Sequence, residues 1–340
     1  MKKLKSMNLN LIVGNPPYHK ETEKTSDKPI YNIFIDASKE VSPRVSLLTP
    51  ARYLFNAGKT PKAWNRKMLN DEHCKVLLYK TEASGIFSKT DIKGGIAAMY
   101  YDSIRQFGKI GEFIAYKELG MIAAKVGGGG AMSDIVHPQN KFLLDELYKV
   151  CPEARGVIGS GGSERRLTTS IFRKIPLFRE SEMPNSIRIL GLNGKNRCYR
   201  WIDKSLIEPH PNLEKYKVVV PKSNGSGAIG EALSSPLVEP PFTGITQSFI
   251  TIGAFDNVKE AEACLKYVKT KFARTMLGIM KTTQDNSKKT WRLVPLQDFT
   301  PASDIDWSGS VAEVDRQLYA KYGLSDEEVD FIERMVAPME

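Results

Sequence analysis

The sequence predicts an α/β protein in which a partial, doubly wound sheet of Rossmann-like type is followed by an α+β region. Over the first hundred residues, short apolar runs alternate with helix-like patterns, as they do along an open sheet. Beyond about residue 110 the alternation gives way to a less regular pattern rich in Gly, Ser and basic residues. The 340 residues, 41% hydrophobic and 26% charged, suffice for two domains with real cores.

The first region contains four predicted strands and two predicted helices. The first apolar run stops abruptly at Gly14, and Gly94-Gly95 precedes the last one with the backbone freedom that a sharp hairpin needs. The predicted strands cover residues 9–13, 45–48, 76–79 and 95–101, and the predicted helices cover 31–39 and 61–69. This order of elements predicts an α/β domain over residues 1–110.

The second region, residues 111–300, has a predicted strand over 218–220 and one long amphipathic helix over 259–281. The capping pair Asp256-Asn257 begins that helix, and its polar side carries Lys266, Lys269, Lys271 and Arg274. Residues 301–340 form a third region with 3 basic and 10 acidic residues. There, a helix over 311–322 ends at Gly323 and a capping box beginning at Ser325 opens the last helix. The acidic tail is expected to pack on the second region or on a neighbouring module.

The junction after the first strand, Gly14-Asn15-Pro16-Pro17-Tyr18, carries the most functional information. It presents a side-chain amide, carbonyl groups and a flat ring in a stiff turn, because proline fixes the backbone. A planar base with an exocyclic amine fits such a set of groups. The structural alternative is an ordinary strand followed by a Pro-Pro turn.

Residues 11–18 resemble the N6-adenine DNA methyltransferases of restriction-modification systems, which carry Asn-Pro-Pro-Tyr at the end of a sheet strand. These enzymes flip the adenine out of the duplex, because its amine is out of reach inside the stack. The resemblance implies that Asn15 and the Pro16 carbonyl accept hydrogen bonds from the amine, within the catalytic set Asn15, Pro16, Pro17 and Tyr18. It also implies that Tyr18 stacks on the base.

The resemblance extends to a second aromatic residue and to a DNA target-recognition domain. Residues 84–96 look like the segment in which another ring closes over the flipped base, which makes Phe87 the expected second face of the clamp. A core aromatic at a strand edge is the alternative for Phe87. The segments 246–249, 281–284 and 291–296 resemble the family's recognition region more loosely; Gln247, Thr283 and Gln284 there are polar groups able to read base edges.

Basic residues are concentrated in the middle of a chain whose net charge is +10. Residues 155–224 hold 14 Lys and Arg against 6 Asp and Glu, which favours a polyanion-binding surface over a merely solvated face. Three loops there mix glycine, amide and cation. The residues expected to contact double-stranded DNA are Arg165, Arg166, Lys195, Arg197, Arg200, Lys222 and Asn224.

The methyl donor that the resemblance implies is S-adenosylmethionine, and its site is expected to be incomplete. The family binds it through a glycine-rich turn and an acidic residue that precede Asn-Pro-Pro-Tyr, and only fourteen residues precede Asn15. The glycines at 225–230 and 244 are not followed by the required helix and strand. A partner chain or an N-terminal domain is therefore expected to supply the cofactor motif, and without it the chain is expected to be inactive.

Other site classes receive no support from the sequence. The four cysteines have no paired spacing, so neither a disulfide framework nor a metal is expected. No apolar run reaches 18 residues and no signal peptide is indicated, which predicts a cytoplasmic protein without a membrane segment. Three hypotheses remain open: part of an adenine methyltransferase, a catalytically inactive DNA-binding specificity subunit or truncated fragment, and a nucleic-acid-binding protein unrelated to methylation.

Overall fold

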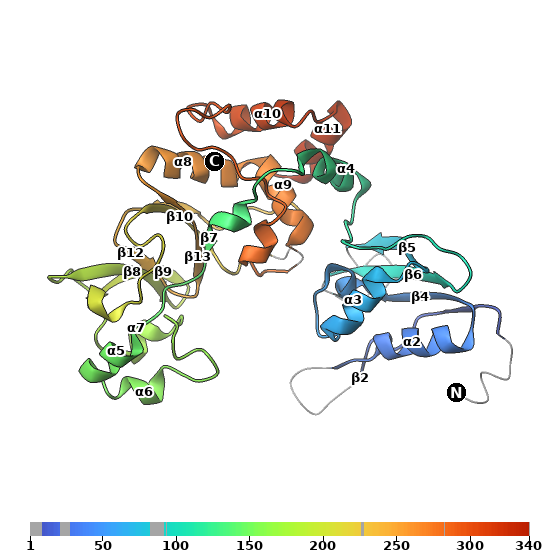
Figure 1. Ribbon diagram of the computed structural model, residues 1–340, viewed down its shortest axis with the longest axis horizontal. Coiled ribbons are helices and arrows are strands. Elements are labelled where there is room, and N and C mark those ends of the chain that lie inside the picture. Colours follow the sequence, from blue (N-terminus) through green and yellow to red (C-terminus); the bar gives the residue numbers. More distant parts are fainter. Residues whose placement is uncertain are drawn as a thin grey trace. The chain divides into compact units, whose positions relative to one another are not determined.

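The computed structural model describes residues 9–20, 28–81, 92, 94–225, 228–281 and 283–339 (Figure 1). Its contacts divide the chain into two compact units, Met1–Tyr116 and Lys117–Glu340. The sequence places a boundary near 110 and a separate region from 301. In the structure the two tail helices pack inside the second unit. The chain is mixed α/β, with several sheets in its described parts.

The first unit is built on a four-stranded sheet in the order β1-β4-β6-β5. β1 runs parallel to β4, whereas β6 is antiparallel to both β4 and β5. Its elements are β1 (Ile12–Gly14), β2 (His19–Lys20), β3 (Lys28–Pro29), α2 (Tyr31–Val41), β4 (Arg44–Pro50), the 3-10 helix η1 (Ala51–Phe55), α3 (Lys62–Asn70), β5 (Cys74–Lys80) and β6 (Ile96–Asp102). All four predicted strands and both predicted helices are confirmed, with ends shifted by a few residues.

Alternation of buried and exposed residues explains why these segments form strands. Along β4, Val45 and Leu47 are buried on the core face, and they pack with Ile35 of α2 and Met99 of β6. Gly94 and Gly95, with φ of 88° and 74°, turn the chain into β6. A side chain at Gly95 would collide with the Lys80 backbone, so the predicted glycine turn is confirmed.

The second unit contains two further sheets. One is antiparallel in the order β11-β10-β13-β7, and the other has the order β12-β8-β9, in which β8 and β9 form a hairpin. The strands are β7 (Val136–His137), β8 (Ser186–Asn193), β9 (Asn196–Asp203), β10 (Tyr216–Pro221), β11 (Leu237–Glu239), β12 (Thr243–Ile245) and β13 (Phe249–Phe255). The strand predicted over 218–220 is thus confirmed as β10.

Helices complete the second unit. They are α4 (Lys117–Val126), η2 (Met132–Ile135), α5 (Leu144–Val150), α6 (Ala154–Val157), α7 (Ile171–Lys174), η3 (Lys204–Leu206), α8 (Val258–Lys269), α9 (Lys271–Met280), η4 (Lys288–Trp291), α10 (Val311–Lys321) and α11 (Asp326–Met335). The predicted capping box at Ser325 is confirmed, since Ser325 accepts from the Glu328 amide. Helices α10 and α11 pack on α9, and α10 also contacts α8 (Figure 1).

The single helix predicted over 259–281 is wrong. Thr270 adopts an extended conformation, with φ −57° and ψ 149°, and its hydroxyl accepts from the Ala273 amide, so α8 ends there and α9 begins. Because the segment forms two helices, the residues exposed to solvent differ from those that a single helix predicts. Arg274, expected on the polar side, is 1% exposed and lies among α9, α11 and the loop before β11.

Candidate functional site

The Asn-Pro-Pro-Tyr turn lies at the carboxyl end of β1. Gly14, the last residue of β1, is opposite Leu47 of the parallel strand β4, which continues for three more residues to Pro50. Open α/β sheets bind ligands outside the carboxyl ends of their strands. Pro16 is buried and anchors the turn, whereas Asn15 is exposed. The turn therefore holds an amide at the sheet edge where ligand chemistry is expected.

The side chains of Tyr18 and Asn15 lie close enough to interact. Tyr18 is half-buried, and its backbone carbonyl accepts a 3.1 Å hydrogen bond from the Ile30 amide just before α2. Burial raises the pKa of the Tyr18 phenol, and the interaction with Asn15 lowers it by less. The phenol is thus neutral at physiological pH and lies beside the amide.

An aromatic cluster supports the elements that follow the turn. Trp64 of α3 contacts Tyr53 of η1 and Tyr31 of α2 edge to face, with ring centroids 5.3 and 6.4 Å apart. Its indole also donates a 2.9 Å hydrogen bond to Asp36 of α2. Since α2 carries the backbone group that holds Tyr18, this packing helps to fix the turn.

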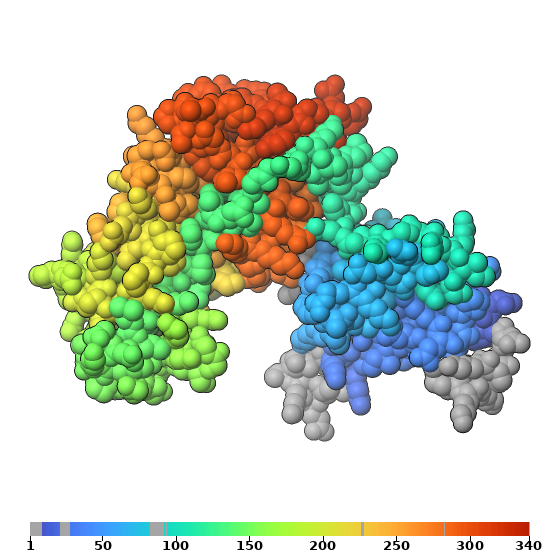
Figure 2. All heavy atoms as spheres, viewed as in Figure 1, coloured from blue at the N-terminus to red at the C-terminus, as the bar shows by residue number. Residues whose placement is uncertain are grey.

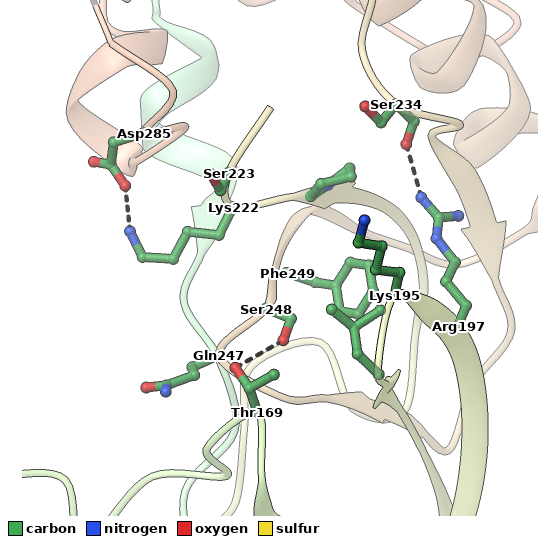
Figure 3. Close-up of a pocket in the computed structure, with 12 residues that line it drawn as sticks. Thr169, Lys195, Arg197, Lys222, Ser223, Ser234, Gln247, Ser248, Phe249 and Asp285 are labelled. Atoms are coloured by element: carbon green, nitrogen blue, oxygen red, sulfur yellow. Dashed lines mark hydrogen bonds and ion pairs between the residues drawn. The ribbon is translucent and has the colours of Figure 1, made fainter. Parts of the chain in front are cut away.

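A second candidate site is a basic pocket of about 630 Å³ in the second unit (Figure 3). The β8–β9 hairpin, which projects from this unit in yellow-green, contributes Lys195 and Arg197 (Figure 2). Outside the hairpin, the lining comes from the segment before α7, from the end of β10 and the loop after it, from the β12–β13 connection with the start of β13, and from the loop after α9. The full set of residues that line the basic pocket is Thr169, Leu192, Lys195, Arg197, Pro221, Lys222, Ser223, Ser234, Gln247, Ser248, Phe249 and Asp285.

The cations of the basic pocket differ in how they are held. Arg197 donates to the Ser234 carbonyl at 2.7 Å and lies over the ring of Phe249. Lys222 pairs with Asp285 at 2.5 Å. Lys195, at the hairpin tip, is exposed. In Figure 3 the Lys222–Asp285 pair lies on one side of the Phe249 ring and Lys195 and Arg197 lie on the other.

The structure brings only part of the predicted DNA-contacting set together. Lys195, Arg197 and Lys222 share the basic pocket, whereas Arg165 pairs with Glu208 at 3.4 Å and Arg200 pairs with Glu180 at 2.7 Å elsewhere in the unit. Arg166 is exposed and also lies outside the pocket lining.

Asn224 has a structural place in the second unit. It is 3% exposed, and its amide donates to the Ala232 carbonyl at 2.8 Å while its oxygen accepts from the Ser234 amide at 2.6 Å. Its side chain therefore shapes the loop behind the basic pocket. Phe87 and most of the segment around it lie outside the described residues, so the predicted second face of the base clamp stays a prediction.

Residues 2–87 match the family model described as Eco57I restriction-modification methylase. In this segment the chain is similar to restriction-modification methylases. The match includes the Asn-Pro-Pro-Tyr turn and extends to β5, whereas the whole second unit lies beyond it. No curated protein matches the chain.

Two solved structures are distantly similar. They are the type IIG restriction endonuclease BpuSI, with TM-score 0.38 and 9% identity over 98% of this chain and 54% of that one, and the Type IIL restriction-modification enzyme MmeI in complex with DNA. For MmeI the TM-score is 0.41 and the identity 8%, over 96% of this chain and 56% of that one. The chain thus spans about half the length of both. Neither likeness is close enough to assign a site.

The glycine-rich segments do not fit a site for S-adenosylmethionine. Gly127 to Gly130 lie between α4 and η2, and the glycines after β10 lead to β11 without an intervening helix. Neither forms a strand, turn and helix unit of the kind that binds a nucleotide cofactor. Within the described ranges, no cluster of three His, Cys, Asp or Glu residues is placed to hold a metal ion, and no helix combines the length and apolarity of a membrane span.

Sequence reasoning missed the acidic residue of the basic pocket. Asp285 directly follows Gln284, one of the polar residues predicted to read base edges. The Ser223–Asp285 bridge brings Asp285 beside Lys222. The only signal in the sequence is the polar run at 282–287, and nothing there indicates which strand it joins. The pairing of two segments sixty residues apart comes from the fold.

Proposed function

We propose that this chain is the base-binding and DNA-recognition part of an adenine-N6 DNA methyltransferase of a restriction-modification system. The observation that carries the proposal is the exposed Asn15 amide, beside Tyr18, at the carboxyl end of β1 within a segment similar to restriction-modification methylases. The basic pocket adds a surface of suitable charge for DNA in the other unit.

The turn is suited to hold the exocyclic amine of a flipped adenine. The Asn15 side-chain oxygen and the Pro16 carbonyl would each accept one amine hydrogen, and Tyr18 would stack on the ring. Accepting both hydrogens localises the lone pair on the amine nitrogen and directs it away from the ring. The reaction then needs no strong general base, because the amine becomes nucleophilic without prior loss of a proton. Phe87 is proposed as the second face of the clamp.

The second unit is proposed to grip double-stranded DNA. Lys195, Arg197 and Lys222 line one pocket, and Arg165, Arg166 and Arg200, which lie outside its lining, are proposed as further contacts. Such cations meet phosphates and fix the register of a protein on the duplex. Asn224 is left out of the proposed contacts, because its polar groups are already used within the loop.

The cofactor, S-adenosylmethionine, is proposed to be held largely by a segment that pairs with the open edge of β1. Among the described strands β1 has a neighbour on one side only. Leu11 and Val13 are 49% and 71% exposed, and α2 exposes Ile33 and Phe34 at 61% and 41%. An edge strand with exposed apolar residues is a template for another strand. A cofactor-binding strand and helix would extend the sheet there.

The identity of the methylated base tests the proposal. The chain together with a cofactor-binding segment is incubated with duplex DNA and isotopically labelled S-adenosylmethionine, and the DNA is digested to nucleosides. We expect the label in N6-methyladenine. Label in methylated cytosine, or no label under conditions in which the assembly binds the donor, contradicts the proposed function.

Val13→Lys tests the open edge of β1. We expect it to weaken association with the cofactor-binding segment at least about tenfold, because a charged side chain on an edge strand opposes pairing with another strand. Association is measured by sedimentation or titration of the two polypeptides. Leu77→Lys is the matched control, since Leu77 is 53% exposed on β5 at the other side of the sheet. Equal association of both variants would place the segment elsewhere.

A DNA-binding specificity subunit without catalysis is the second candidate. The observation that favours it is that the basic pocket and the Asn-Pro-Pro-Tyr turn belong to different units, so DNA binding does not require the turn. In that case Asn15→Ala and Tyr18→Ala leave sequence-selective binding intact, Arg165→Ala or Arg166→Ala weakens it, and no variant or parent protein methylates DNA.

A further inference from the structure

The Lys222–Asp285 pair places a donor and an acceptor side by side at the basic pocket. The Lys222 ammonium and the Asp285 carboxylate are 2.5 Å apart, and their side chains are 39% and 52% exposed. An ion pair this exposed contributes little to folding stability. A carboxylate also opposes the approach of a phosphate. A role in phosphate binding therefore explains the lysine but not its partner.

The backbone holds the pair in place. The Lys222 amide donates to the Ser248 carbonyl at 2.9 Å, and the Lys222 carbonyl accepts from the Asn286 amide at 2.7 Å. Ser223 and Asp285 form an antiparallel bridge. The two charged side chains thus start from adjacent, paired backbone positions.

Buried groups support this arrangement from behind. Asn286 is fully buried, donates to the Pro221 carbonyl at 3.2 Å and accepts from the Trp291 indole at 2.8 Å. Lys281, 2% exposed, donates to the Asn224 carbonyl at 2.7 Å. A rigid support of this kind favours recognition, because the side chains lose little conformational entropy when they bind.

The geometry matches the major-groove edge of a G·C base pair. Guanine presents acceptors at O6 and N7, and cytosine presents a donor at N4. The O6 and N4 atoms are hydrogen-bonded to each other, so they lie about 2.9 Å apart. Lysine is a common partner of guanine O6 and N7, and aspartate accepts from cytosine N4. If the pair is reversed to C·G or replaced by A·T, the lysine faces a donor on one base and the aspartate faces an acceptor on the other.

We propose that Lys222 and Asp285 together read one G·C base pair of the recognised DNA site, with Lys222 donating to guanine and Asp285 accepting from cytosine. Lys195 and Arg197, across the Phe249 ring, hold the adjacent phosphates (Figure 3). The inference rests on the proposed function for its ligand, duplex DNA, but requires no methyl transfer. Lys222 and Asp285 are specificity-determining residues in this scheme.

Selection from a randomised duplex library, followed by sequencing, tests the inference on the full chain. The parent protein should enrich a motif with one nearly invariant G·C position. Asp285→Ala and Lys222→Met should each relax that same position and lower the preference for G·C by roughly tenfold to a hundredfold. Other positions of the motif should keep their preference.

Two controls separate base reading from general charge. Lys195→Ala should weaken binding to all sequences and reduce the slope of affinity against salt by about one phosphate contact, with the motif unchanged. Asp256→Ala, which breaks the similarly exposed Lys215–Asp256 pair outside the pocket, should change neither motif nor affinity.

Three results would overturn the inference: no enriched motif for the parent protein, an unchanged motif in Asp285→Ala and Lys222→Met, or a uniform gain in affinity for all DNA in Asp285→Ala. The selection reads binding alone. A motif that relaxes as expected while the nucleoside assay finds no N6-methyladenine would reject methylation and retain the base-reading role. N6-methyladenine in the nucleoside assay, together with an unchanged motif in both variants, would retain the proposed function and reject the base-reading role.

Discussion

Asn15→Ala is expected to lower the rate of methyl transfer by about 10²- to 10³-fold in the complete assembly, which is the usual cost of removing one positioned polar group from a reacting centre. The structural reason is that Asn15 is the exposed amide of the turn and lies beside Tyr18. The measurement is single-turnover methylation of duplex DNA with saturating donor, which separates the chemical step from binding.

The same variant should leave DNA affinity within about threefold, because the basic pocket belongs to the other unit and most binding free energy comes from phosphate contacts. Asn10→Ala is the matched control, since Asn10 is an exposed asparagine just before β1 and has no proposed role. An unchanged single-turnover rate in Asn15→Ala would reject the methyltransferase proposal. Loss of rate in both variants would instead indicate damage to β1.

The sequence predicted the helices and strands of the first unit because they all pack on one sheet, which spaces their apolar residues regularly. Val45 and Leu47 are buried and alternate with the less buried Ser46 and Leu48, and two glycines mark the entry into β6. The same reasoning placed Asn15 at the end of a strand. It did not show that the side chains of Tyr18 and Asn15 lie together, because that contact depends on how the Tyr18 backbone is held by the Ile30 amide just before α2.

In the second unit, charge pattern found the right region but not the right partners. Lys195, Arg197 and Lys222 come together because the β8–β9 hairpin and the end of β10 face the same pocket. Arg200, only three residues beyond Arg197, lies outside the pocket lining and pairs with Glu180. Asp285 was missed because its place depends on a non-local bridge to Ser223. Composition cannot encode such pairings, since they are fixed by tertiary contacts.

Helical periodicity places Arg274 on the polar side of a helix, whereas the structure buries it. Substitution of this buried arginine is expected to cause a large loss of stability. The guanidinium is buried and donates to four backbone carbonyls: Gly230 at 2.9 Å, Ala337 at 2.6 Å, Lys269 at 3.0 Å and Thr270 at 3.3 Å. Arg274→Ala removes the side-chain donor from all four carbonyls, of which the Thr270 carbonyl keeps the backbone amide of residue 274 at 3.2 Å, and it opens a cavity. We expect it to lower the free energy of unfolding of the second unit by about 3–5 kcal/mol.

Urea unfolding measures this loss, and hydrogen exchange of peptides that cover α9 and α11 locates it, because the arginine joins these two segments. Arg316→Ala is the matched control, since Arg316 is exposed on α10, and it should change stability by no more than about 0.5 kcal/mol. Arg274→Met restores most of the lost volume without donors. If Met recovers the full stability, the hydrogen bonds contribute nothing net and packing alone explains the burial of this arginine. Partial recovery, with faster exchange in α11 retained, is the expected result because the Ala337 carbonyl still lacks its donor.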